Sequence, residues 1–481
     1  MDRGFFIDGE WRKIKGSDVF PILNPATGQR IGSTALGTAE TIDQAVNVAS
    51  LAFPKFSKMS ANERAEILLK AADNIELAAD KMAELLTKEQ GKPKADNLKE
   101  IIFGAEVLRY YAGEATRIYG SIRPASSPNI RNLVNYHPVG VAGAIVPWNY
   151  PIDLYCWKIA PAIAAGCPII VKSPHETPLA ITMLVDCIHQ AGMPNGCLAD
   201  IPGLGPIAGD ALARHPKIRI LSATASIAAG QSITRASAGN LKKLCLELGG
   251  HAPFIVMPDA DLKEAAMAAH RRSFSNMGQI CITVNRILVH NSCHKEFVSI
   301  LEELTTNTIV GDGLDKEISY GPVLNSSVSD RVQNQINDAI SKGGRLISGG
   351  FKPTEKHLIN GNFFRPTLID NTPLDSLPMI EESYGPLAAI ASFETENEML
   401  EIANGLEYGL AAYIYGNDLE KVWLLAENLD FGAIGINVND TSELQAPFGG
   451  WKMSGVGREL GPEGLMSYLE PKHLKMKLGN K

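Results

Sequence analysis

The clearest helical pattern in the chain lies at residues 60–90, where apolar side chains recur at steps of three and four. That spacing places the apolar side chains on one face and predicts a single long amphipathic helix. Ser60 and Glu63 form a capping-box pattern at its start. Gly91 and Pro93 follow the last apolar position, so we expect the helix to end there.

Short apolar runs alternate with helical stretches from about residue 139 onward. The runs cover residues 139–146, 168–173, 197–203, 218–224 and 243–250. The alternation continues with an expected helix at 259–272, a strand at 286–290 and a helix at 294–308. This order predicts the α/β fold class, with two doubly wound α/β domains built on mainly parallel sheets. Such sheets bind nucleotides at the carboxyl ends of their strands.

Residues 120–138 interrupt this pattern with polar, alternating positions. A period of two indicates half-exposed strands, so we expect a protruding strand pair here. Residues 465–478, near the C-terminus, have a pattern suited to pairing with it.

The composition of the 481-residue chain, 45% hydrophobic and 20% charged, is ordinary for a globular protein with a large core. Its formal net charge of −8 disfavours general binding to nucleic acid or acidic membranes, because phosphate binding requires clustered positive charge. No apolar run approaches the roughly 18 residues of a membrane span. The N-terminal MDRGFFIDGEW lacks the pattern of a signal peptide. We therefore expect a cytoplasmic protein that binds neither nucleic acid nor a membrane.

The seven cysteines form no recognisable framework. Their number is odd and no C-x-x-C spacing occurs, so neither disulfide bonds nor a metal site is expected. A free cysteine in a reducing compartment is most often a small buried hydrophobic residue. Cys281 resists that interpretation because it ends the sequence FSNMGQIC.

Five local sequences carry the candidate chemistry: PWNYP (147–151), ELGG (247–250), FSNMGQIC (274–281), EESYGP (381–386) and PFGGWKMSGVGRELG (447–461). Singly, each has a plainer interpretation, since prolines and glycines mark turns. Together and in this order they resemble the aldehyde dehydrogenase superfamily, over nearly the whole chain. The resemblance implies a homodimer or homotetramer. Each subunit would contain a cofactor-binding domain at 1–119 and 139–247, a catalytic domain at 248–447, and an oligomerisation segment at 120–138 and 462–481.

The resemblance also implies a reaction, the oxidation of an aldehyde to a carboxylic acid with NAD(P)+ through a thiohemiacetal and a thioester. Cys281 matches the nucleophile, whose thiolate attacks the carbonyl carbon. Asn149 matches the amide that stabilises the resulting oxyanion together with the backbone N–H of Cys281. Glu247 matches the base that activates water to hydrolyse the thioester.

Nine positions match residues that surround the cofactor in this family: Val146, Trp148, Lys172, His175, Gly205, Ser226, Gly230, Glu382 and Tyr384. Lys172 and Glu382 match groups that bind the ribose rings, and Tyr384 matches an aromatic side chain near the nicotinamide. Ser226 and Gly230 lie at the expected N-terminus of a helix, which can hold a pyrophosphate.

Two departures from the family pattern concern the choice of cofactor. His175 stands where the family often has an acid that pairs with the adenosine ribose, unless a local shift lets Glu176 take that place or His175 simply faces solvent. An acid repels the 2′-phosphate of NADP, whereas a histidine can donate to it. Ala225 replaces a glycine of the phosphate turn and alters the expected backbone approach. We expect NADP to serve at least as well as NAD.

Six positions match the aldehyde tunnel of the family: Tyr150, Leu154, Trp157, Ile280, Ile282 and Phe448. Their character favours an apolar, aromatic or hydroxylated aldehyde. Family members that recognise the carboxylate of a semialdehyde often have an arginine where Trp157 stands, so succinic semialdehyde is disfavoured. The polar loop at 439–445 is a candidate contact for a hydroxylated substrate.

Two alternatives remain open from the sequence. A CoA-acylating relative would transfer the acyl group to CoA and needs no water-activating base, so Glu247 argues against it. A non-catalytic protein with the same fold would not need Asn149, Glu247 and Cys281 together.

Overall fold

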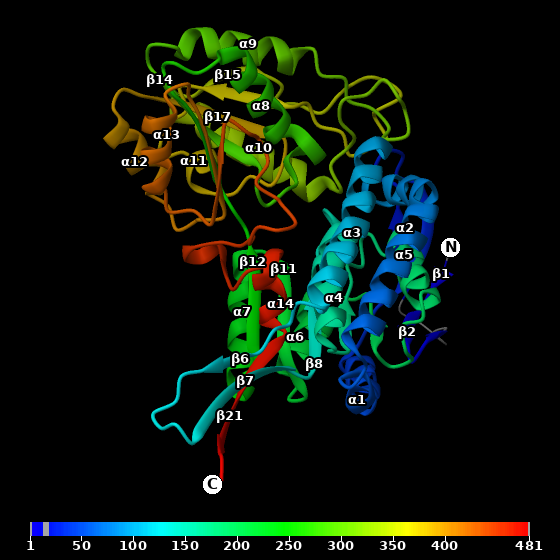
Figure 1. Ribbon diagram of the computed structural model, residues 1–481. Coiled ribbons are helices and arrows are strands. Elements are labelled where there is room, and N and C mark those ends of the chain that lie inside the picture. The colour runs from blue at the N-terminus through cyan, green and yellow to red at the C-terminus, as the bar shows by residue number, and fades with distance from the viewer. Residues whose placement is uncertain (1, 13–18, 480–481) are drawn as a thin grey trace.

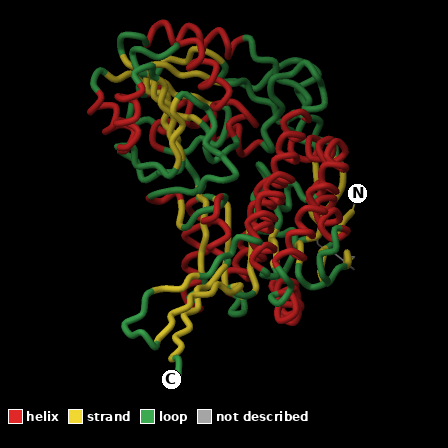
Figure 2. Tube along the Cα trace, viewed as in Figure 1, coloured by secondary structure: helices red, strands yellow, loops and turns green. Residues whose placement is uncertain are grey.

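The computed structural model describes residues 2–12 and 19–479. Two large sheets organise the chain, and in Figure 1 the seven-stranded sheet lies above the eight-stranded one. Figure 2 shows the strands of both large sheets accompanied by helices, and a group of long strands that projects downward toward the C-terminus.

The eight-stranded sheet has the order β20-β12-β11-β8-β9-β10-β2-β3. Its strands are β20 (Gly455–Val456), β12 (Lys243–Leu248), β11 (Ile218–Ala225), β8 (Val141–Ile145), β9 (Ile169–Lys172), β10 (Leu198–Asp200), β2 (Phe5–Ile7) and β3 (Glu10–Arg12). The strands from β12 to β10 are parallel, and they correspond to the five apolar runs expected from the sequence. β20 and the β2–β3 hairpin add antiparallel edges.

Helices cover both faces of this sheet, which confirms the doubly wound arrangement. One face shares a buried cluster with α1 (Ala39–Phe56), α6 (Asp210–Arg214) and α7 (Ile227–Ser237). The other packs against α4 (Pro151–Ala165) and α5 (Leu179–Gln190), which are covered in turn by α2 (Ala61–Gln90) and α3 (Lys94–Ala115).

The long helix expected at residues 60–90 is α2. Ser60 accepts a hydrogen bond from the backbone N–H of Glu63, and the Glu63 side chain accepts one from the backbone N–H of Ser60. Gly91 ends the helix with φ +100°, a left-handed conformation that favours glycine. The capping box and the stop signal are therefore both confirmed.

The seven-stranded sheet has the order β15-β16-β17-β14-β13-β18-β19 and is parallel except for β15. Its strands are β15 (Arg345–Ser348), β16 (Thr367–Asp370), β17 (Leu387–Phe393), β14 (Val284–His290), β13 (Ala252–Val256), β18 (Ala411–Tyr415) and β19 (Ala433–Ile436). Its helices are α8 (Leu262–Phe274), α9 (His294–Thr306), α10 (Ser326–Ser341), α11 (Leu377–Ile380), α12 (Glu396–Asn404) and α13 (Leu419–Glu427). The expected elements at 259–272, 286–290 and 294–308 are α8, β14 and α9.

Several elements were not identified from the pattern, among them α1, α3 and β13. The central strand β13 contains Pro253, which lacks a backbone donor and is typical of edge strands. The charged residues of α3 are spread over several faces, so its apolar stripe is weak.

The remaining strands form two small sheets. β1 (Asp2–Arg3), β5 (Arg30–Ala35) and β4 (Val19–Leu23) make one of them. In the other, β21 (Leu469–Lys477) pairs antiparallel with β7 (Ile130–Pro138), which pairs with β6 (Ser121–Arg123). This sheet projects from the body beside α14 (Gly461–Ser467) in Figure 1, which confirms the expected strand pair and its C-terminal partner.

No helix within residues 2–12 and 19–479 is long and apolar enough to cross a membrane. The same residues contain no group of three or more His, Cys, Asp or Glu side chains placed to hold a metal ion.

Candidate active site

The backbone just before Cys281 is strained. After α8, the turn Ser275–Gly278 has φ +49° at Asn276, +54° at Met277 and +71° at Gly278. Two successive left-handed residues that are not glycine, Asn276 and Met277, are costly, and such strain clusters at functional sites. A Cβ at Gly278 would lie 2.1 Å from the carbonyl oxygen of Gly385, so only glycine fits there.

Side chains of the same motif hold this strained turn. Asn276 Nδ2 donates to the carbonyl oxygen of Asn149 (3.2 Å), and Gln279 Nε2 donates to the carbonyl oxygen of Asn276 (2.8 Å). Gln279 Oε1 accepts from the backbone N–H of Leu324 (2.9 Å). The Asn and Gln of FSNMGQIC therefore fix the loop that presents Cys281.

The two glycines of ELGG permit a close approach between three segments. A Cβ at Gly250 would lie 2.4 Å from the carbonyl oxygen of Cys281, and one at Gly249 would lie 2.5 Å from Glu382 Oε2. The backbone N–H of Gly250 donates to Glu382 Oε1 (3.2 Å). The motif thereby brings Glu247, at the end of β12, to the cysteine loop.

Asn149 comes from the PWNYP turn, directly before α4. Its side chain is 2% exposed, and Nδ2 donates to the carbonyl oxygen of Gln279 (3.1 Å). Oδ1 has no hydrogen-bond partner among the residues that the structure describes. The amide is thus fixed beside the loop that carries Cys281.

Half-buried Cys281 and buried Glu247 lie beside each other. Burial raises the pKa of the Cys281 thiol well above its usual value, and the neighbouring Glu247 carboxylate raises it further. Burial also raises the pKa of Glu247 to about 7, although Cys281 and Thr224 partly oppose that change. Neither Glu247 oxygen has a partner with hydrogen-bond geometry in the described part of the chain. Glu247 is therefore free to exchange a proton near neutral pH.

A buried ion pair lies behind Glu247. Lys158 Nζ donates to Thr224 Oγ1 (2.7 Å) and to Glu459 Oε1 (2.9 Å), which also accepts from Ser222 Oγ (2.8 Å). Lys158 lowers the pKa of Glu247, and Glu459 raises it. The two effects oppose each other, so burial dominates at Glu247.

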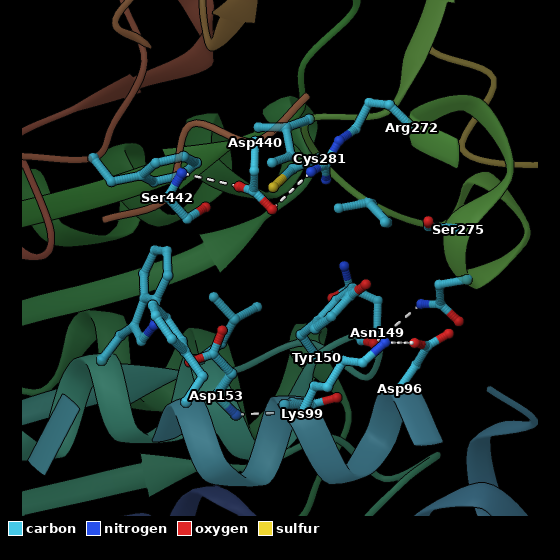
Figure 3. A pocket seen from close by; sticks show the side chains of 18 of the residues that line it. Asp96, Lys99, Asn149, Tyr150, Asp153, Arg272, Ser275, Cys281, Asp440 and Ser442 are labelled. Carbon is cyan, nitrogen blue, oxygen red and sulfur yellow. Dashed lines mark hydrogen bonds and ion pairs between the residues drawn. The ribbon is translucent and has the colours of Figure 1, made fainter. Parts of the chain in front are cut away.

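Two cavities meet at Cys281 and Asn149, which line both of them. The first, of about 260 Å³, is shown in Figure 3 and lies between α3, α4, α8 and the loop before residue 448. It is lined by Asp96, Lys99, Glu100, Phe103, Asn149, Tyr150, Asp153, Leu154, Trp157, Arg271, Arg272, Ser275, Asn276, Ile280, Cys281, Ile282, Asp440, Ser442 and Phe448. The second, of about 360 Å³, is lined by Pro147, Trp148, Asn149, Thr224, Ala225, Ser226, Gly249, Cys281, Arg331, Glu382 and Tyr384.

The first cavity contains all six residues expected for the aldehyde tunnel: Tyr150, Leu154, Trp157, Ile280, Ile282 and Phe448. Trp157 and Phe448 meet edge to face, with ring centroids 5.2 Å apart. Part of the wall is therefore apolar, as the sequence indicates.

The second cavity contains Trp148, Ser226, Glu382 and Tyr384 of the expected cofactor residues. The rings of Trp148 and Tyr384 meet edge to face at 5.7 Å. Ser226 caps α7, where its Oγ accepts from the backbone N–H of Ala229. The other expected cofactor residues do not line this cavity.

Three of those other residues have identifiable surroundings. Val146 is fully buried, and the open space around Gly205 leaves room for a larger side chain. A Cβ at Gly230 would lie 2.5 Å from a methyl carbon of Leu248, so this glycine lets α7 pack against β12. Gly230 thus has a packing role, and its contact with cofactor stays a prediction.

Neither Lys172 nor His175 lines the second cavity, and both interact with Glu176. His175 Nδ1 lies 3.1 Å from Glu176 Oε2, and the His175 ring meets the ring of Phe20 at 4.7 Å. Burial raises the pKa of Glu176, but His175 and Lys172 outweigh that effect and the net pKa is lowered. An ionised acid is therefore present next to His175.

The sequence interpretation missed most of the charged lining of the first cavity. The missed residues are Asp96, Lys99, Glu100, Arg271 and Arg272, whereas Asp440 belongs to the polar loop at 439–445 that was expected to contact substrate. The missed residues come from two separate helices, and no short motif joins them, so a sequence pattern alone offered no signal for them.

Arg331 was also missed, in the second cavity. It projects from α10, and its Nε and Nη2 donate to the carbonyl oxygens of Ser383 (2.8 Å) and Tyr384 (3.2 Å). Tyr384 has φ +46°, a strained conformation for a tyrosine. Arg331 therefore helps to hold Tyr384 over the cavity.

Comparisons with known proteins agree with this geometry. The Aldehyde dehydrogenase family matches residues 11–474. The chain is 41% identical to a succinate semialdehyde dehydrogenase of Acinetobacter baylyi, over 97% of this chain and 96% of that protein. Among solved structures, an NADP dependent enzyme of E. coli has a TM-score of 0.97 at 36% identity, over 99% of this chain and 98% of that one. A 3,6-anhydro-L-galactose dehydrogenase has a TM-score of 0.97 at 34% identity, over 99% and 100%.

Proposed function

Because the chain belongs to the aldehyde dehydrogenase family, we propose that it oxidises an aldehyde to a carboxylic acid with NAD(P)+, through a thioester on Cys281. The observation that carries the proposal is that Cys281 and Asn149 line both cavities and that Glu247 lies beside Cys281. In this arrangement the first cavity receives the aldehyde and the second receives the cofactor.

The second cavity has the groups that a nicotinamide dinucleotide requires. The N-terminus of α7 at Ser226 offers backbone donors and a partial positive charge to a phosphate. Glu382 offers carboxylate acceptors to ribose hydroxyls, and Trp148 and Tyr384 offer aromatic surface. The nicotinamide of bound NAD(P)+ supplies the hydride acceptor.

The first step forms a carbon–sulfur bond. Glu247 accepts the proton of the Cys281 thiol, and the sulfur attacks the carbonyl carbon of the aldehyde. The carbonyl oxygen becomes an oxyanion, which Asn149 Nδ2 stabilises by donation from a fixed, buried position. Collapse of this thiohemiacetal expels a hydride and leaves a thioester on Cys281.

The second step hydrolyses the thioester and breaks its carbon–sulfur bond. Glu247 first releases the proton it took from the thiol to solvent. As a carboxylate again, it accepts a proton from water while the water oxygen attacks the thioester carbon. The carbon–sulfur bond breaks, and Cys281 takes the proton back from Glu247 as the carboxylic acid leaves. The raised pKa of Glu247, about 7, suits a group that must both accept and return a proton near neutral pH.

For the cofactor, we propose that NADP serves at least as well as NAD. His175 supports this, because it can donate to a 2′-phosphate, and the E. coli relative is an NADP dependent enzyme. Glu176, 3.1 Å from His175, opposes it by placing a carboxylate nearby.

For the substrate, the aromatic and aliphatic wall favours an aldehyde with a hydrocarbon portion beside Cys281. A purely apolar preference has no support from the relatives, since one of them acts on succinate semialdehyde. The charged lining of the cavity also argues that the far end of the aldehyde is polar.

For the assembly, we propose a homodimer or homotetramer joined through the sheet of β6, β7 and β21. The outer strand β21 carries Leu474 and Met476, which are 45% and 49% exposed. Sedimentation that gives only monomer at micromolar concentration would remove this proposal.

The test of the reaction is NAD(P)H formation with a panel of aldehydes, with and without CoA, together with identification of the product by mass spectrometry. A free carboxylic acid as product, independent of CoA and absent with Cys281→Ala, is expected. An acyl-CoA product, or turnover unchanged in Cys281→Ala, would overturn the proposal.

A further inference from the structure

The cavity beside Cys281 has polar groups on two facing walls. Figure 3 shows Arg272, Asp440 and Ser442 on one side, and Tyr150 and Asp153 on the other. The reaction described above uses none of these groups.

Arg272 is fixed on its wall by the protein itself. It is 9% exposed, and it lies at the end of α8. Its Nε donates to the carbonyl oxygen of Asn439 (2.5 Å), and its Nη2 donates to Asp440 Oδ2 (2.7 Å). Asp440 Oδ1 also accepts from the backbone N–H of Ser442 (3.0 Å), which orders the loop.

The third nitrogen of Arg272 has no such partner. Nη1 forms no hydrogen bond or ion pair with any residue within 2–12 and 19–479. An arginine that lines a cavity, and whose other two nitrogens are held by the protein, presents rigid donors at low entropic cost. Nη1 is therefore available to a molecule in the cavity.

Asp153 supplies a second polar group on the facing wall, from α4. Its Oδ1 is buried and has no hydrogen-bond partner in the described chain. Burial raises the pKa of this carboxyl well above its usual value, and the nearby Glu100 raises it further. A neutral carboxyl can both donate and accept a hydrogen bond.

Most charged side chains that line this cavity already form ion pairs within the protein. The pairs are Arg272 with Asp440, Lys99 with Asp96, and Glu100 with Lys92. Only Arg271 lacks an ion pair in the described chain, and its exposure lets solvent and salt screen it. A carboxylate near Arg272 would lie close to Asp440, whereas a hydroxyl adds no charge and can both accept and donate.

We propose that Arg272 is a specificity-determining residue that binds an uncharged oxygen, such as a hydroxyl, on the tail of the aldehyde, with Asp153 as its second partner. This inference rests on the proposed oxidation of an aldehyde at Cys281. It narrows the substrate class to hydroxylated aldehydes rather than aldehydes with an anionic tail.

The experiment compares kcat/KM for 3-hydroxypropanal, butanal and succinic semialdehyde. The first two differ by a hydroxyl in place of a methyl group. The protein is expected to favour 3-hydroxypropanal over butanal by about tenfold, as for one hydrogen bond to a charged donor. Arg272→Lys keeps the positive charge but loses the planar guanidinium with its several N–H donors. The preference should therefore disappear through a higher KM for 3-hydroxypropanal. Arg271→Lys is the matched control and should leave the ratio within about twofold.

Asp153→Leu is an independent test, because leucine has a similar size but lacks the hydrogen-bond donor and acceptor of the carboxyl group. It should lower the preference for 3-hydroxypropanal without a matching loss on butanal. Thermal melting and alkylation of Cys281 by iodoacetamide report whether each variant keeps its folded site.

Two results would overturn the inference. Equal losses on butanal and 3-hydroxypropanal in Arg272→Lys would mean that Arg272 only holds the loop at Asn439–Ser442. Succinic semialdehyde as the best substrate, with its largest loss in Arg272→Lys or Arg271→Lys, would mean that the tail is anionic. Either result leaves the proposed reaction standing, since butanal oxidation that depends on Cys281 tests that separately.

Discussion

The two cavities that meet at Cys281 are built in different ways. The cofactor-side cavity is built where short segments approach closely: Gly249 in its lining lies against the Glu382 side chain, and nearby Gly278 lies against the carbonyl oxygen of Gly385. The aldehyde-side cavity is lined by side chains from α3, α4, α8 and a loop, such as Lys99, Asp153 and Arg272. Backbone approach demands particular residues at particular positions, whereas a side-chain lining can change one residue at a time.

This difference predicts how substitutions will act. Substitutions at the junction, where Cys281 and Asn149 line both cavities beside Glu247, should abolish the reaction for every aldehyde. Substitutions on the aldehyde-side wall should alter the ratio of kcat/KM values between aldehydes. Changes near the far end of the cofactor should alter only the ratio between NADP and NAD.

The largest expected effect is at the junction itself. Cys281→Ala removes the attacking sulfur, so dehydrogenase activity should fall by about 10⁵-fold or more, as when an enzyme nucleophile is lost. Binding of NADP, followed by isothermal titration, should be little changed because the rest of the cofactor-side lining is intact. Turnover near the original rate would contradict the mechanism.

That junction was also the part most accessible from the sequence. FSNMGQIC and ELGG are contiguous, and each of their polar or glycine residues has a local reason: Asn276 and Gln279 hold the turn, and Gly250 admits the carbonyl oxygen of Cys281. The five parallel strands of the lower sheet were equally readable, because buried parallel strands are continuous apolar runs.

The features that could not be predicted from the sequence depend on tertiary contacts. Arg272 and Asp440 are 168 residues apart and become partners only when α8 meets the loop after β19. Val146 lies in a buried core and Gly230 in the packing of α7 on β12, and their contact with the cofactor stays a prediction. β13 escaped because Pro253 is unusual in a central strand.

Glu247→Gln should produce the next largest effect. Glutamine cannot accept a proton, so hydrolysis of the thioester should slow by about 10²- to 10⁴-fold. A covalent acyl adduct on Cys281 should then accumulate and be visible by mass spectrometry. Unchanged steady-state turnover would exclude Glu247 as the base.

The pH dependence of thioester hydrolysis gives a further test of Glu247 as the base. Burial raises the pKa of Glu247 to about 7, and only the carboxylate can accept a proton from water. The rate of hydrolysis should therefore increase as the pH rises through about 7, and level off above it. In Glu247→Gln this rise should be absent, and a rise that persists would assign it to another group.

Asn149→Ala should have a smaller effect that still applies to every aldehyde. Loss of one oxyanion donor lowers kcat by about 10²- to 10³-fold. Asn149→Asp is the matched variant, since it keeps the shape but places a negative charge beside the oxyanion and should be at least as impaired. An effect confined to the KM for cofactor would place Asn149 on the cofactor side only.

The smallest expected effect concerns the choice between NADP and NAD, at the far end of the cofactor. His175→Glu would place a second carboxylate beside Glu176, where a 2′-phosphate carries nearly two negative charges. Two like charges about 4 Å apart cost roughly 1 kcal/mol in water and roughly 4 kcal/mol at an effective dielectric of 20. At a half-buried site near the lower end of that range, kcat/KM for NADP should fall by about tenfold while NAD is little affected. Glu176→Gln is the matched control, because it removes the acid already present and should raise the use of NADP. The measurement is kcat/KM for both cofactors in the three proteins, with Kd values from titration. A strong preference of the unaltered protein for NAD, with no loss of NADP use in His175→Glu, would show that this end of the cofactor lies elsewhere.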